Sequence, residues 1–174
     1  MKSILILTTP RTGSNLLLNS LACHPRAVTA GEVLSDDALS FNTEEAIQNI
    51  QSGTDWNLCK VLFSDIHKHE FNQIYHRCEF RLHLYRRDIV AQASSWVTAC
   101  ETGIWVNGQV RPNPCLPPMA PIEQISASRI LLPALCDISI CYETMIENWD
   151  ATISYVLSCA QWEQYHLPMA WEKM

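Results

Sequence analysis

The stretch "ILILTTPRTGSNLLLNSL", residues 4–21, decides the fold. An apolar run leads into a Pro-Arg-Thr-Gly-Ser-Asn turn, and a leucine-rich segment follows. This order predicts a strand, a loop and a helix, and the free N–H groups at the start of such a helix attract anions. Gly13 permits close backbone approach, and Arg11 adds a permanent charge. The alternative is a plain turn in which Pro10 and Gly13 punctuate the chain and Ser14 caps the helix.

Length and composition favour one globular domain over residues 1–174. The net charge of −6 argues against a general nucleic-acid binder, so any anion site must be local. The eight cysteines include no C-x-x-C pair, and we expect them to be reduced thiols in a cytoplasmic protein. No run approaches the roughly 20 apolar residues of a membrane span, so no transmembrane segment is expected.

Apolar runs alternate with amphipathic segments along the chain. Strands are expected at Ser3–Thr9, Asn57–Phe63, Phe80–Tyr85 and Ile138–Tyr142, and helices at Ser14–Cys23, Asp88–Glu101, Pro121–Leu135 and Thr144–Ala160. Such alternation predicts an α/β fold with a mainly parallel sheet covered by helices. The irregular Pro- and Gly-rich segment 103–121 is expected to be an acceptor-binding or lid loop.

A second anion signal lies in "FRLHLYRRDIVAQASSW", residues 80–96. Arg86 and Arg87 follow the third predicted strand, at the sheet edge where open α/β folds bind ligands. Asp88 is expected to cap the next helix, which places Ser95 about two turns further along. An arginine fork and a serine hydroxyl suit a phosphate. The alternative is that both arginines pair with surface carboxylates.

Three segments carry a family resemblance. "TTPRTGSNLL" resembles the phosphosulfate loop of sulfotransferases that use 3'-phosphoadenosine 5'-phosphosulfate (PAPS), and "YRRDIVAQASSW" resembles their 3'-phosphate motif. "CYETMIENW" resembles the segment whose tyrosine contacts adenine. The form "RRDIVAQASSW...ETGIW" is especially similar to the bacterial trehalose 2-sulfotransferase family. The resemblance implies a three-layer, P-loop-like fold.

The resemblance also implies the nucleotide-binding residues. The 5'-phosphosulfate would be cradled by Arg11, Thr12, Gly13, Ser14 and Asn15. Arg87 and Ser95 would hold the 3'-phosphate, with Ser94 as the alternative serine, and Tyr142 would contact adenine. The chain departs from the family at Asn15, where threonine is usual, and at Leu16, where cytosolic relatives use an aromatic residue. It also ends at Met174 without the Arg-Lys-Gly-like segment of many cytosolic relatives.

Sulfuryl transfer needs stabilisation of the leaving phosphate and a base for the acceptor proton. We assign the first role to Arg11. The resemblance implies Glu32, in "TAGEVLS", as the base, and a solvated loop carboxylate is the alternative reading of Glu32. Competing bases are His67, His69 and His83. Lys60 is a candidate for neutralising the sulfuryl group, and a strand lysine at the surface is its alternative. Asp65, His67 and His69 lack an evident fourth ligand, so no metal is expected.

The sequence thus predicts an enzyme that transfers a sulfuryl group from PAPS to a hydroxyl acceptor, by family analogy a sugar or glycolipid. Trp105 is a candidate for stacking on a sugar, and packing in the fold is its alternative. A homodimer is plausible by the same analogy. One alternative class is a P-loop kinase or nucleotide hydrolase, although the G-x-x-x-x-G-K-[ST] pattern is missing. Another is a catalytically degenerate nucleotide-binding protein.

Overall fold

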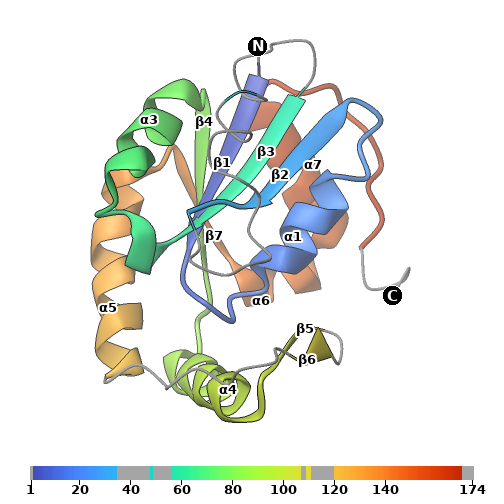
Figure 1. Cartoon of the computed structure of the whole chain (residues 1–174). Helices are drawn as coiled ribbons and strands as arrows, with labels where there is room; N and C mark the ends of the chain where they lie inside the picture. The colour runs from blue at the N-terminus through green and yellow to red at the C-terminus, as the bar shows by residue number, and fades with distance from the viewer. Residues whose placement is uncertain (1, 35–47, 49–55, 107–108, 111–119, 170–174) are drawn as a thin grey trace.

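A computed structural model describes residues 2–34, 48, 56–106, 109–110 and 120–169 (Figure 1). Its centre is a five-stranded parallel sheet in the order β2-β3-β1-β4-β7. The strands are β1 (Lys2–Thr8), β2 (Ala27–Glu32), β3 (Trp56–Leu62), β4 (Phe80–Tyr85) and β7 (Ile138–Cys141). A separate antiparallel pair consists of β5 (Ile104–Val106) and β6 (Gln109–Val110).

Helices cover both faces of this sheet (Figure 1). The α-helices are α1 (Ser14–Leu21), α3 (His69–Arg77), α4 (Ile89–Thr102), α5 (Pro121–Leu131), α6 (Tyr142–Glu147) and α7 (Trp149–Cys159). Two 3₁₀ turns are η1 (Phe63–Asp65) and η2 (Leu132–Leu135). Among the described residues, no helix is long and apolar enough to cross a bilayer.

The alternation of side chains along β1 explains the layers. Ile4 and Ile6 belong to one buried cluster with residues of α1, α6 and α7, whereas Leu5 and Leu7 belong to another with residues of α3 and η2. All four side chains are fully buried. Successive residues of a strand point to opposite faces, so one apolar run supplies both cores. The predicted α/β fold with a parallel sheet flanked by helices is confirmed.

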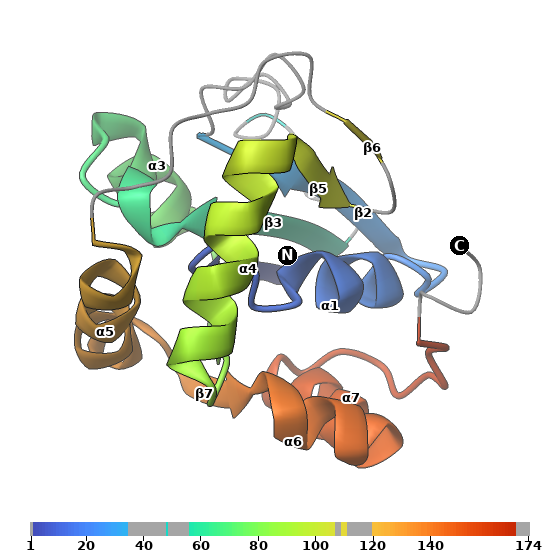
Figure 2. The same cartoon turned by 90° about the horizontal axis from the view of Figure 1, so that it is seen from below.

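Helix α4 crosses the carboxyl end of the sheet, as the view from below shows (Figure 2). Asp88 caps it as predicted, because its Oδ1 accepts a hydrogen bond from the Ala91 backbone N–H at 2.8 Å. Gly103 ends it in the left-handed conformation, with φ of 70°. Trp96 and Cys100 of α4 pack against Ile125 of α5. The helix is therefore fixed directly over the edge where parallel strands present ligand-binding loops.

Four strands lie within one residue of their predicted ends. The short strands β5 and β6 were not predicted, and neither was β2. Its alternation is broken by a bulge between Thr29 and Gly31, where Gly31 takes a φ of 70°. The predicted loop at 103–121 is described only at residues 103–106, 109–110 and 120–121, so its role as a lid lies outside the described residues.

Two helix predictions were wrong in their extent, and one capping alternative was wrong. The helix expected over Thr144–Ala160 is two helices, because Asn148 leaves the helical region with φ −132° and ψ 53°. The helix expected to reach Leu135 ends at Leu131 and tightens into η2, which contains Pro133. Gly13, rather than Ser14, is the N-cap residue of α1.

Candidate functional site

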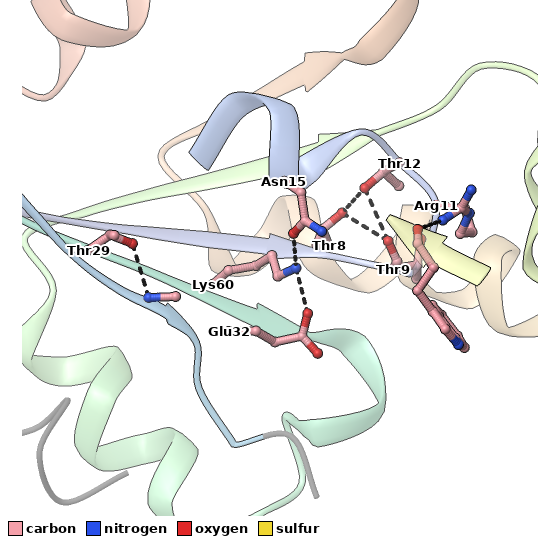
Figure 3. A network of polar contacts seen from close by, with 10 residues as sticks. Thr8, Thr9, Arg11, Thr12, Asn15, Thr29, Glu32 and Lys60 are labelled. Atoms are coloured by element: carbon pink, nitrogen blue, oxygen red, sulfur yellow. Dashed lines mark hydrogen bonds and ion pairs between the residues drawn. The ribbon is translucent and has the colours of Figure 1, made fainter. Parts of the chain in front are cut away.

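The β1–α1 loop, residues 9–13, leaves the middle strand of the sheet at its carboxyl edge (Figure 3). Arg11 and Gly13 both adopt left-handed backbone conformations, with φ of 65° and 82°. Gly13 has no side chain with which to cap α1. The positive end of the α1 dipole is therefore directed at this edge, as an anion site requires.

Three threonines brace the loop from within (Figure 3). The hydroxyls of Thr8 and Thr12 lie 2.5 Å apart, and the Thr12 hydroxyl also donates to the Thr9 carbonyl at 3.1 Å. Thr8 further donates to the Leu84 carbonyl of β4 at 3.0 Å. Thr12, a predicted nucleotide ligand, is buried and serves here to hold the loop in shape.

Helix α4 fastens the loop from the other side. The Gln92 amide Nε2 donates to the Thr9 hydroxyl at 2.8 Å and to the Pro10 carbonyl at 2.7 Å. The Arg11 Nε donates to the Ser95 hydroxyl at 3.0 Å, and its Nη1 donates to the Trp105 carbonyl of β5. The structure thus brings together Arg11 and Ser95, which the family resemblance assigned to opposite ends of a nucleotide.

An ion pair between a buried lysine and a half-buried glutamate lies beside the start of α1 (Figure 3). The Lys60 Nζ of β3 lies 2.5 Å from the Glu32 Oε2 of β2, and it donates to the Asn15 Oδ1 of α1 at 2.6 Å. Glu32 and Lys60 are direct partners in the β2–β3 register, and the Lys60 side chain is only 4% exposed against 25% for Glu32. The pair therefore links the predicted base to the predicted phosphosulfate loop through Asn15.

Glu143 organises the carboxyl ends of β4 and β7. Its oxygens accept hydrogen bonds from the backbone N–H groups of Arg87 and Asp88 and from the Cys141 thiol, at 2.8, 3.4 and 3.0 Å. Burial alone would raise the pKa of the Glu143 carboxyl, but these hydrogen bonds lower the pKa to about 2. Glu143 is thus ionised at neutral pH and joins the start of α6 to the segment that leads into α4.

Tyr142 lies against the β1–α1 loop. A Cβ at position 13 would clash with the Cε2 of Tyr142, so the Tyr142 ring rests directly on Gly13. Only glycine fits at this position, because it accepts both the contact and the left-handed φ. The expected adenine residue therefore covers the loop itself in this structure.

The candidate histidines lie elsewhere. His83 is buried in β4 with its Nδ1 3.3 Å from the Ser139 hydroxyl. Burial, together with the nearby Arg129 charge, lowers its pKa to about 4. His67 and His69 are exposed on either side of Lys68, which pairs with Asp65 at 3.1 Å. In the described part of the chain, no group of three or more His, Cys, Asp or Glu residues is placed to hold a metal ion.

The other predicted site residues have simpler positions. Ser14 is buried at the start of α1, and Leu16 packs in the core. Ser94 is exposed, and Trp105 packs against the cluster between α4 and α5. Arg87 reaches α6 rather than Ser95, since its Nη2 donates to the Thr144 hydroxyl at 3.2 Å.

The sequence reasoning missed Gln92 and Glu143. Gln92 lies inside the quoted "RRDIVAQASSW" motif, one helical turn after the Asp88 cap and three residues before Ser95, so helical spacing was the available signal. Glu143 follows Tyr142 in the third quoted motif. Its hydrogen bonds to β4–α4 residues depend on strand order, which the sequence does not reveal.

A parallel sheet with a helix start and buried polar side chains at its carboxyl edge defines a class of α/β ligand-binding folds. No family model matches the chain, and no curated protein matches it. The chain is similar in structure to mouse sulfotransferase SULT7A1 complexed with PAP, with a TM-score of 0.57 and 8% identity. The match covers 95% of this chain and 60% of that chain. The fold is therefore of the sulfotransferase type.

Proposed function

We propose that the chain transfers a sulfuryl group from PAPS to a hydroxyl acceptor. The observation that carries this proposal is the convergence of the β1–α1 loop with the Glu32–Lys60–Asn15 cluster at one sheet edge. The β1–α1 loop supplies hydrogen-bond donors for an anion, and the cluster supplies the Glu32 carboxylate as a base that accepts a proton. The similarity to a sulfotransferase complexed with PAP supports the same reaction class.

The donor set fits a phosphosulfate. The N–H groups at the start of α1 and the Arg11 guanidinium suit phosphate and sulfuryl oxygens. Arg11, Gly13, Ser14 and Asn15 would hold the 5' end of the nucleotide, with Thr12 bracing the loop. The 3'-phosphate would bind near Ser95, at the end of β4, where the family resemblance implies an arginine ligand.

Transfer then follows from these positions. The acceptor hydroxyl gives its proton to Glu32 while its oxygen bonds to sulfur and the bond from sulfur to the bridging phosphate oxygen breaks. The leaving phosphate keeps the bonding electron pair. Arg11 and the start of α1 stabilise the charge that develops there. Lys60 holds the Glu32 carboxylate toward the loop through the contact with Asn15.

The acceptor proposed by analogy is a sugar or glycolipid, and a homodimer stays a prediction of the same resemblance. A cytoplasmic location stays a prediction from the cysteine content. Two alternative functions differ from sulfuryl transfer in ways that can be tested. A P-loop kinase places its lysine within the phosphate loop, whereas the lysine beside the start of α1 here comes from β3. A binding-only protein would bind nucleotide without turnover.

The test is transfer of radiolabelled sulfuryl from PAPS to a panel of monosaccharides, disaccharides, a glycolipid and a phenol. Wild type should label at least one acceptor, and Glu32→Gln should label it at least a hundredfold more slowly. Glu147→Gln, an exposed carboxylate of α6, is the matched control and should keep wild-type activity. Labelling by Glu32→Gln at the wild-type rate would remove Glu32 from the mechanism, and PAP binding without transfer would favour the binding-only alternative.

A further inference from the structure

Two adjacent arginines at the end of β4 have different surroundings. Arg87 is exposed, and its backbone N–H and its Nη2 donate to Glu143 and Thr144 at the start of α6. These contacts occupy Arg87 in joining β4 to α6. Arg87 therefore has a clear structural task away from the β1–α1 loop.

Arg86 is linked to the β1–α1 loop through Tyr142. Its Cζ is 5.6 Å from the centre of the Tyr142 ring, and that ring rests on Gly13. Among the described residues, the Arg86 Nε is buried and has no hydrogen-bond partner. The Glu143 Oε1 lies 3.8 Å from this nitrogen, which gives charge attraction but exceeds a hydrogen bond. A buried donor without an acceptor costs free energy that a ligand oxygen would recover.

Arg11 provides the second observation. Burial lowers the pKa of the Arg11 guanidinium, and the positive charge of Arg86 lowers the pKa further. The charges of Arg11 and Arg86 are therefore close enough to repel each other, and Glu143 is the carboxylate beside Arg86. A bound phosphate group would offset this repulsion, because both arginines would then be attracted to its negative oxygens.

We infer that Arg86, rather than the motif residue Arg87, supplies the guanidinium that acts with Arg11 and Ser95 on a phosphate group of the nucleotide. This inference rests on the proposed function, and it deepens it by exchanging one binding residue for its neighbour. The chemistry is shared by the 3'- and the 5'-phosphate, so the ligands in the test must separate them.

The test is calorimetric titration of Arg86→Gln and Arg87→Gln with 3'-phosphoadenosine 5'-phosphate (PAP) and with adenosine 5'-phosphate. The two variants remove the same charge from adjacent positions, so each is the control for the other. Arg86→Gln should weaken PAP binding tenfold to a hundredfold, and Arg87→Gln should weaken it less than threefold. Loss for PAP alone would assign Arg86 to the 3'-phosphate, and equal loss for both ligands would assign it to the 5'-phosphate.

An equal or larger loss in Arg87→Gln would overturn the inference while leaving the proposed function intact, as would losses below threefold in both variants. Absence of PAP binding by the wild type at millimolar ligand would instead overturn the proposed function, and this inference with it. If Arg86→Gln does not fold by circular dichroism, Arg86→Lys and Arg87→Lys replace the pair. The same order of losses is then expected, because lysine lacks the guanidinium fork.

Discussion

The Glu32–Lys60 pair allows a prediction in which the two partners behave unequally. Breaking a buried ion pair costs about 3 to 5 kcal/mol when the remaining charge stays buried. After Lys60→Met, the remaining Glu32 carboxylate is already 25% exposed and regains water. After Glu32→Met, the remaining Lys60 ammonium is 4% exposed and keeps only its bond to Asn15 from this cluster. We therefore expect losses of about 2 kcal/mol for Lys60→Met and about 3 kcal/mol for Glu32→Met.

The assay is urea unfolding of both single variants and the double variant, with the m value unchanged as the condition for comparison. The double variant should lose about 1 to 3 kcal/mol less than the sum of the singles, since two apolar side chains replace a pair that costs desolvation. Glu147→Met at an exposed position should change stability by less than about 0.5 kcal/mol. Additive losses, or a larger loss from Lys60→Met, would refute the reasoning.

Three further predictions concern the surroundings of the site. Gly13→Ala should lower the free energy of unfolding by about 2 to 3 kcal/mol in chemical denaturation, because the new Cβ would meet Tyr142 and the φ of residue 13 is 82°. If Gly13→Ala costs as much in a Tyr142→Ala background, the contact with Tyr142 is not the cause. Gln92→Leu should lose about 2 kcal/mol in thermal unfolding, since it leaves Thr9 and Pro10 acceptors unpaired, and a change under about 0.5 kcal/mol would argue against this bracing. The pKa of His83 is about 4 in the folded chain against an ordinary value of 6.5, so between these pH values the unfolded chain binds one more proton than the folded chain. The free energy of unfolding should therefore rise by about 2 kcal/mol from pH 4 to pH 6.5, and His83→Asn should flatten that rise relative to wild type.

The strands with continuous apolar runs were predictable because burial on both faces leaves a clear signal in the sequence. The edge strand β2 was not, because the bulge at Gly31 interrupts its pattern. The break at Asn148 was hidden for a related reason: the apolar stripe continues through it, so periodicity alone indicates one helix.

The site residues show a similar limit. Glu32 and Lys60 were each singled out, but their pairing depends on the β2–β3 register, and β2 was not predicted. Gln92 received no role, because its partners are loop atoms about 80 residues earlier that only the folded sheet brings to α4. The side chains of Arg86 and Arg87 have different partners because of the contacts at the end of β4. The sequence shows only two adjacent arginines and does not distinguish them.

Calorimetric titration of the wild-type chain with PAP, with adenosine 5'-phosphate as the comparison ligand, tests the central claim most directly. The account predicts saturable PAP binding that is at least tenfold tighter than binding of adenosine 5'-phosphate, because the second phosphate adds charge-assisted hydrogen bonds to arginine. Equal affinity for the two ligands, or no heat of binding at millimolar PAP, would contradict it.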